Sequence, residues 1–168
     1  MIKKTFLACS LIFIASFTLL AQKEKIQSAF IYTIVSKYVE WPESNRSGDF
    51  VIAVLGNSTI INELMDLSDN RKIGGQRIVV KKFKTAGEIS ECHVLYVSDA
   101  KINEMDEAVS KVGNTLIITS EAPAVTKGNA INFIEVNGKQ SFWVKPQNAT
   151  KKGLVVSPEL SKMIASNG

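Results

Sequence analysis

The stretch AFIYTIVSKYVEWP, residues 29–42, decides how the rest of the chain is read. On a helical wheel its apolar side chains cover about half of the circumference, and a narrower arc is polar. The pattern predicts a helix covered on most sides, with one thin strip facing water. Pro42 disfavours helical geometry in the preceding residue, so we expect the helix to end with the Trp41 indole in its last turn. The apolar positions are Phe30, Ile31, Ile34, Val35, Tyr38, Val39 and Trp41, and Ile26, just before the stretch, lies on the same face.

Two interpretations fit the end of this predicted helix. Aromatic residues at helical spacing usually pack in a core, which accounts for Tyr38 and Trp41 without any partner. Trp and Tyr also concentrate binding energy at protein interfaces, and an exposed corner would then anchor a partner. Both interpretations stay open, and the candidate partner-binding residues here are Tyr38, Glu40, Trp41 and Pro42.

The chain begins with two lysines, an apolar run over residues 6–20 and the small Ala21, after which it turns polar. This order is that of a secretory signal peptide, and we expect cleavage near Ala21–Gln22. The alternative is a single membrane anchor, because the 16 residues Phe6–Ala21 fall just short of the span of a bilayer. Cleavage leaves residues 22–168, which we expect to form one domain.

The charge and the cysteine content argue against nucleic-acid binding and against an intramolecular disulfide. The net charge of +4 includes two leader lysines, and the remaining balance is too even for nucleic-acid binding. Once the leader is removed, Cys92 is the only cysteine, so no intramolecular disulfide can form. Cys92 adjoins the apolar run 94–97, and we expect a small buried packing residue there. Pairing of this thiol between two chains is the alternative.

Beyond the first helix, apolar runs alternate with helical patterns. Phe50–Leu55 is apolar throughout, which is typical of a strand covered on both faces. A turn at residues 56–59 leads into a helix through about Leu67, and Gly74-Gly75 forms a turn. Further strands are expected at Arg77–Phe83, His93–Val97, Thr115–Thr119 and Leu154–Ser157, and further helical segments at Thr85–Ser90, Ala100–Val112 and Pro158–Ala165.

The last third of the chain contains a hairpin signal. Ile131–Val136 and Lys139–Val144 flank Asn137-Gly138, a pair that supplies the positive φ angles of a type I′ turn. Strands that alternate with helices and end in a hairpin predict an α/β fold. We expect a mixed, mostly parallel sheet with helices on both faces and a C-terminal β-hairpin.

The residues offer no catalytic set. His93 is the only histidine, and because it directly follows Cys92 in a strand, the two side chains point to opposite faces. One cysteine and one histidine are also too few ligands for a metal site. We therefore expect no enzyme activity, no cofactor and no metal, and a His93 ring bonded to a neighbouring backbone group.

Two further groups are candidate binding residues. Gly56, Asn57 and Ser58 follow a strand and precede a helix, the outline of an anion-binding helix start, although the glycines of a dinucleotide fingerprint and the lysine of a P-loop are missing. Helix capping explains Asn57 and Ser58 without a ligand, and a small-anion site is the alternative, since ligands gather at the C-terminal ends of parallel strands. Arg77 is either a solvated strand-end charge or a contact for an acidic partner group.

Several short motifs together suggest a family. They are AFIY at 29–32 with YVEWP at 38–42, FVIAVLG at 50–56, IGGQRI at 73–78 with Phe83, CHVLYV at 92–97, Gly128 with INF at 131–133, and GL at 153–154. With these motifs in this order and spacing, the chain resembles the YfiR/HmsC-like periplasmic regulators from about Lys25 to Ile164.

The resemblance implies an exported, often dimeric α/β domain that does no chemistry. Family members restrain an inner-membrane diguanylate cyclase by binding its periplasmic part, and release raises cyclic-di-GMP and promotes biofilm. Related domains are fused to sensor kinases, so the membrane partner can differ. We expect a periplasmic, homodimeric regulator of this kind. A small-solute-binding sensor that passes its ligand state to a membrane kinase or transporter is the alternative.

Two departures from the family pattern limit what is carried over. Better-studied members contain disulfides that this chain cannot form, which leaves redox control in doubt. Lys145 stands where the family usually has Asn after the last hairpin strand, so no role of that position is transferred.

Overall fold

The computed structural model describes residues 22–120 and 128–165. The predicted leader, residues 1–21, lies outside this part of the chain. The strands are β1 Val39–Glu40, β2 Phe50–Leu55, β3 Lys72–Ile73, β4 Gln76–Phe83, β5 Val94–Val97, β6 Leu116–Ser120, β7 Ile131–Val136, β8 Lys139–Val144 and β9 Val155–Val156. The α-helices are an N-terminal helix over residues 22–37, α2 Ile60–Asp69, α3 Met105–Lys111, α4 Pro146–Thr150 and α5 Pro158–Ala165. Single-turn or short 3₁₀ segments lie at Glu43–Asn45, Ala86–Glu88 and Asp99–Glu104.

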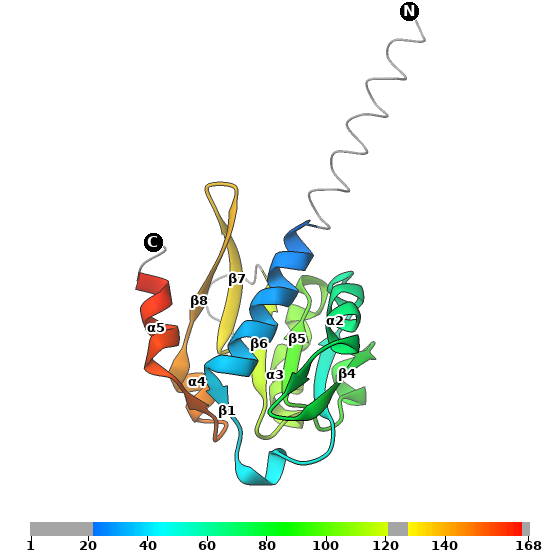
Figure 1. Ribbon diagram of the computed structural model, residues 1–168. Coiled ribbons are helices and arrows are strands. Elements are labelled where there is room, and N and C mark those ends of the chain that lie inside the picture. The colour runs from blue at the N-terminus through cyan, green and yellow to red at the C-terminus, as the bar shows by residue number, and fades with distance from the viewer. Residues whose placement is uncertain (1–21, 121–127, 166–168) are drawn as a thin grey trace, which may run out of the picture.

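A seven-stranded sheet in the order β3-β4-β2-β5-β6-β7-β8 organises these elements (Figure 1). The apolar β2 lies inside the sheet, where it pairs in parallel with β4 on one side and with β5 on the other. Parallel pairing continues through β6 to β7, and antiparallel pairs occur only at the margins, between β3 and β4 and between β7 and β8. The predicted mixed, mostly parallel sheet is confirmed.

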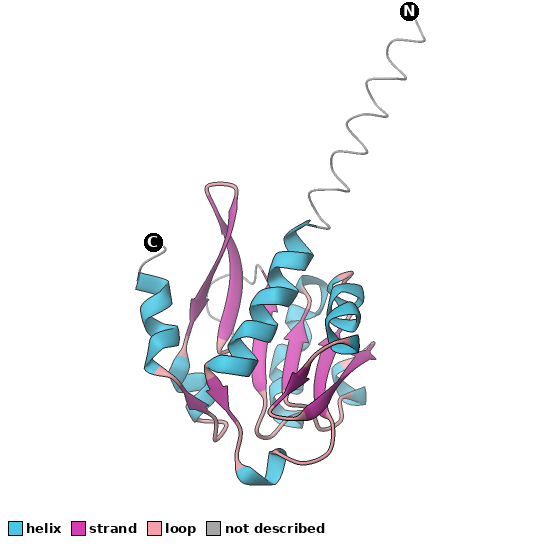
Figure 2. Ribbon diagram, in the orientation of Figure 1, coloured by secondary structure: helices cyan, strands magenta, loops and turns pink. Residues whose placement is uncertain are grey.

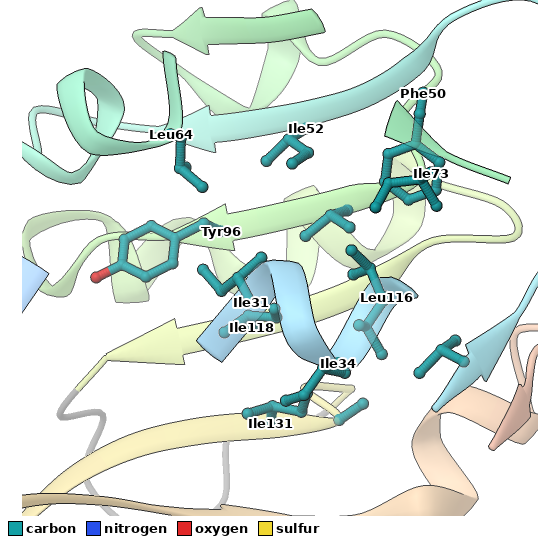
Figure 3. Close-up of a cluster of buried hydrophobic side chains, with 14 of the residues drawn as sticks. Ile31, Ile34, Phe50, Ile52, Leu64, Ile73, Tyr96, Leu116, Ile118 and Ile131 are labelled. Atoms are coloured by element: carbon teal, nitrogen blue, oxygen red, sulfur yellow. The ribbon is translucent and has the colours of Figure 1, made fainter. Parts of the chain in front are cut away.

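Helices cover both faces of this sheet, as predicted (Figure 2). On one face, Ile31 and Ile34 of the N-terminal helix pack with strand residues such as Ile118, as Figure 3 shows. On the other face, Met105 and Ala108 of α3 pack with the opposite side chains of the same strands. Each central strand thus contributes alternate residues to two apolar clusters, which is why its sequence is apolar throughout.

The first helix ends earlier than its periodicity predicts. Helical structure stops at residue 37, and Val39–Glu40 forms β1, which pairs antiparallel with β9 in a separate two-stranded sheet. Ser157 N donates a hydrogen bond to Tyr38 O at 2.8 Å and extends this pairing. The prediction that Trp41 lies in the last turn of the helix is therefore wrong, because long-range strand pairing outweighs the local helical pattern.

Other boundaries follow the sequence closely. The predicted hairpin is present, with φ of 52° at Asn137 and 73° at Gly138. Gly74-Gly75 turns the chain between β3 and β4, a pairing that the sequence pattern did not show because β3 has only 2 residues. The helix expected from Ala100 to Val112 begins as a 3₁₀ segment and becomes α-helical at Met105. No helix within the described ranges is long and apolar enough to cross a membrane.

Candidate functional site

The parallel strands place the candidate residues at opposite ends of the sheet. Gly56, Asn57 and Ser58 follow the carboxyl end of β2, whereas Trp41 and Arg77 lie near the amino ends of the strands. The N-terminal helix connects the two ends, since its first turn lies beside the carboxyl ends of β5 and β6 and its last turn leads to β1 (Figure 1). Its 16 described residues span about 24 Å.

The Trp41 indole lies in the core. Its exposed fraction is 5%, and its ring stands edge-on to Phe50 with the centroids 5.0 Å apart. Within the described residues the indole Nε1 has no hydrogen-bond partner. Tyr38 and Pro42 are half-buried and Glu40 is exposed, so these three residues form the accessible surface of the corner.

The loop after this corner connects it to Arg77. Arg46 Nε donates to Trp41 O at 2.9 Å, and Arg46 Nη2 lies 3.3 Å from the Glu40 carboxylate. Further along the loop, Arg77 donates two hydrogen bonds to Asp49, from Nε at 3.1 Å and from Nη2 at 2.9 Å. The Arg77 guanidinium holds the pKa of the Asp49 carboxyl below its usual range. All the predicted partner-binding residues therefore lie at one end of the molecule, and Arg77 has an intramolecular partner there.

His93 bonds to the backbone on both sides of its ring, as predicted. Val51 N donates to Nδ1 at 3.0 Å, and Nε2 lies 2.8 Å from Asn45 O. A neutral imidazole with its hydrogen on Nε2 satisfies both contacts, an assignment inferred from these partners. The ring also stacks on Phe50 with centroids 4.5 Å apart, so His93 fastens the loop 43–49 to the amino end of β2.

Cys92 points away from His93 into the apolar cluster on the other face, so the two side chains do not form a dyad. Burial raises the pKa of the Cys92 thiol to about 11, which keeps it protonated and a poor nucleophile at neutral pH. The predicted small buried cysteine is confirmed. Across residues 22–120 and 128–165, no group of three or more His, Cys, Asp or Glu side chains could hold a metal ion.

At the carboxyl ends of the parallel strands, Gly56 allows the loop after β2 to contact the segment after β5, because it has no side chain. Its φ is +94°, and a Cβ at this position would lie 2.7 Å from Lys101 Cγ and closer still to the Ser98 hydroxyl. Backbone bonds hold both loops: Gly56 N donates to Phe83 O at 2.9 Å, and Ser98 N donates to Leu55 O at 3.1 Å. Only glycine fits both the backbone angle and the space.

The predicted capping of α2 by Asn57 or Ser58 is wrong. The N-cap residue is Thr59, and it makes no side-chain capping bond. The Asn57 Oδ1 accepts a hydrogen bond from Lys82 Nζ at 2.5 Å, and the Thr59 hydroxyl donates to the Glu24 carboxylate. These polar groups bond to β4 and to the N-terminal helix because both elements reach the same end of the sheet. No pattern in the sequence points to Glu24, and Lys82 stands out only as a member of a cluster with Lys81 and Lys84.

A cavity of about 250 Å³ lies at this end, between the ends of β2, β5 and β6 and the start of the N-terminal helix. After β2 the chain continues to β4, which lies on one side of the pair β2 and β5. After β5 it continues to β6, which lies on the other side of this pair. The two connections therefore leave the pair in opposite directions. Ligands bind at such a topological switch point in open α/β sheets. We name this feature the carboxyl-end cavity and define it by Gln27, Ser58, Tyr96, Ser98, Asp99 and Ser120.

Two polar groups of the carboxyl-end cavity are buried. The Tyr96 hydroxyl donates to Gln27 Oε1 at 3.3 Å, and burial raises the pKa of Tyr96 to about 12, so it is a hydrogen-bond donor at neutral pH. In Figure 3 this hydroxyl points away from the labelled isoleucines. Ser98 is 6% exposed, and its hydroxyl has no hydrogen-bond partner among the described residues. Sequence reasoning missed both residues, because they become neighbours of Ser58 only through the pairing of β2 with β5.

These features define an α/β domain with one polar region at each end of a mostly parallel sheet. The family model described as YfiR/HmsC-like matches residues 24–163, and the chain belongs to this family. The resemblance carried by the sequence motifs is thereby confirmed. The family is a periplasmic, non-catalytic family of regulators that act on membrane signalling proteins. Comparison with curated proteins gives no significant match.

Proposed function

We propose that this protein is an exported regulator that restrains an inner-membrane diguanylate cyclase and so controls cyclic-di-GMP and biofilm formation. The observation that carries the proposal is the YfiR/HmsC-like match over residues 24–163. Cleavage of the leader near Ala21–Gln22 and a homodimeric state belong to the same proposal. A membrane sensor kinase is the second partner that fits this family.

The proposed contact surface for the partner is the accessible part of the corner together with the loop that follows it. Glu40 and Arg77 carry opposite charges, and their side chains are 71% and 72% exposed. Trp41 supports this surface from inside the core, where it contacts Phe50. Tyr38 and Pro42 complete the surface with half-buried apolar area.

The test is deletion of the gene, followed by measurement of intracellular cyclic-di-GMP and of surface attachment. We expect both to rise, because a restraint on synthesis has been removed, and to return to wild-type values when the gene is restored on a plasmid. Unchanged cyclic-di-GMP under several growth conditions would contradict the proposal. Altered phosphorylation of a response regulator without a change in cyclic-di-GMP would favour a sensor kinase as the partner.

A second candidate function is that of a small-solute-binding sensor, and the carboxyl-end cavity favours it. The small anion proposed at Gly56, Asn57 and Ser58 would bind at the same end of the sheet, in an adjoining hollow that Asn57, Ser58 and Lys82 line. A ligand at about 100 times its dissociation constant stabilises a folded protein by about 2.7 kcal/mol, which a thermal-shift screen detects. Sulfate and phosphate are the first anions to test.

A further inference from the structure

We propose that the carboxyl-end cavity binds a small neutral polyhydroxylated molecule, of the size of a monosaccharide. This inference goes beyond restraint of a membrane partner and does not depend on it. It assigns a ligand class from three observations: a buried hydroxyl without a partner, a set of hydroxyl and amide groups among the lining residues, and a balance of charge between the carboxylates and the ammonium groups around the cavity.

The first observation is the Ser98 hydroxyl. Ser98 is 6% exposed, it lines the cavity, and its Oγ has no hydrogen-bond partner within the described residues. Buried polar groups in folded proteins are almost always hydrogen-bonded, and an unsatisfied hydroxyl destabilises the fold that contains it. The Oγ itself is closed to solvent and lies against Gly56, so a ligand hydroxyl would bond to it after the Ser98 side chain turned towards the cavity.

The second observation is the chemistry of the lining. Tyr96, Ser58 and Ser120 contribute hydroxyls, and Gln27 contributes an amide. Each of these groups can act as both donor and acceptor, which matches the alternating donors and acceptors of a polyol. The Tyr96–Gln27 hydrogen bond is long, at 3.3 Å, so either group can exchange it for a bond to a ligand.

The third observation is the charge. The carboxylates Glu24 and Asp99 lie around the cavity and the adjoining hollow, and so do the ammonium groups of Lys23 and Lys82. Glu24 accepts a hydrogen bond from Thr59, and Lys82 donates to Asn57, so both charges already have partners. The Asp99 and Glu24 carboxylates would repel an anion in the cavity, and the Lys23 ammonium group would repel a cation there. The balance therefore favours a neutral ligand, with Asp99 as an acceptor for its hydroxyls.

The test is a melting-temperature screen of the protein purified from the organism that produces it. D-Glucose, D-galactose, D-ribose and myo-inositol are compared with sodium sulfate and sodium glutamate at 50 mM. We expect a saturable rise in melting temperature with at least one neutral compound, and at least a tenfold weaker affinity for that compound in Ser98→Ala. Ser90→Ala is the matched control, because Ser90 is exposed and precedes β5 at the other end of the sheet.

Two results of the screen would overturn the inference. The first is the lack of a shift with any neutral compound, and the second is a shift with sulfate alone, which would assign the site to a small anion. The variants also test the premise without a ligand. Ser98→Ala should melt at the wild-type temperature or above it, since it removes a hydroxyl that has no partner. A clearly lower melting temperature in this variant, with Ser90→Ala unchanged, would show that the hydroxyl supports the fold, and would overturn the inference.

Discussion

Trp41 shows how a single residue was misplaced by a local pattern. The sequence put it at the end of a helix, whereas it lies four residues beyond the helix and inserts its ring beside Phe50 and His93. The two interpretations of the residue make different predictions for its removal. Its exposed fraction of 5% favours the core interpretation, while the partner-binding role of the corner stays a prediction.

We expect Trp41→Ala to lower the free energy of unfolding by about 3–5 kcal/mol, the usual cost of removing a large buried aromatic side chain. Trp41→Phe should cost much less, because it keeps an aromatic ring against Phe50 and the indole Nε1 has no partner to lose. Urea denaturation of the purified variants measures both values. A Trp41→Ala protein of wild-type stability that no longer regulates its partner would show instead that the indole is an anchor.

The buried Cys92 thiol makes stability depend on alkaline pH. Its pKa rises from the ordinary 9.0 to about 11 in the folded protein, so the thiol contributes stability that is fully present below about pH 9 and is lost as the pH rises through 11. The loss from this group is on the order of 2–3 kcal/mol. Tyr96, with its pKa raised to about 12 by burial, extends the decline to higher pH.

We expect Cys92→Ala to lose less stability than the wild type between pH 8 and pH 10.5, because it has no thiol to titrate. Urea denaturation at the two pH values gives the comparison, and the reaction of the native thiol with a disulfide reagent at pH 8 should be slow. Rapid labelling of the folded protein, or equal pH dependence in the two proteins, would contradict burial as the cause.

At the scale of elements, the longest patterns were predicted best. Phe50–Leu55 and both strands of the hairpin were placed to the residue, since continuous apolar runs and the Asn137-Gly138 turn are local signals. Among the 2-residue strands, β9 lies within the predicted Leu154–Ser157, whereas β1 and β3 were missed, because β1 continues a helical pattern and β3 is defined only by its pairing with β4. The same limit applies to the candidate residues: a local strand-turn-helix pattern indicates Gly56, Asn57 and Ser58, whose anion-binding role stays a prediction, but no local pattern indicates Ser98 or Tyr96.

The hairpin allows a test of the predicted turn chemistry. Gly138 has φ +73° in open space, whereas Gly113 lies in open space without a positive φ. We expect Gly138→Ala to destabilise the protein by about 1 kcal/mol, since a side chain strains this backbone conformation, and Gly113→Ala to be neutral or slightly stabilising. Thermal denaturation of the two variants compares them directly. Equal effects would show that the turn does not require its left-handed geometry.

At the scale of the whole molecule, the N-terminal helix connects two polar ends that have different proposed roles. Lys23, Glu24 and Gln27 lie around the carboxyl-end cavity, and Tyr38 lies in the corner at the other end. A ligand that contacted the first turn of this helix and a partner that contacted its last turn would bind the same rigid element. The proposed regulator would therefore have a ligand site and a partner surface on opposite ends of one sheet.

The partner surface gives a prediction for the regulatory output. We expect Glu40→Arg to raise cyclic-di-GMP towards the level of the gene deletion, because it reverses an exposed charge on the proposed contact surface. Its folding stability should change by less than about 1 kcal/mol, the usual range for an exposed ion pair. Asp106→Arg, an exposed charge reversal on α3, is the matched control and should regulate normally. Equal cyclic-di-GMP in the two variants would exclude Glu40 from the contact.

The most direct test of the central claim is capture of the partner from the cell envelope. An affinity-tagged copy expressed at its natural level is cross-linked in living cells, purified from detergent-solubilised membranes and analysed by mass spectrometry. We expect enrichment of an inner-membrane protein with a cytoplasmic diguanylate cyclase domain, with less of it captured by Glu40→Arg than by Asp106→Arg. Recovery of no membrane signalling protein, together with unchanged cyclic-di-GMP in the deletion strain, would contradict it.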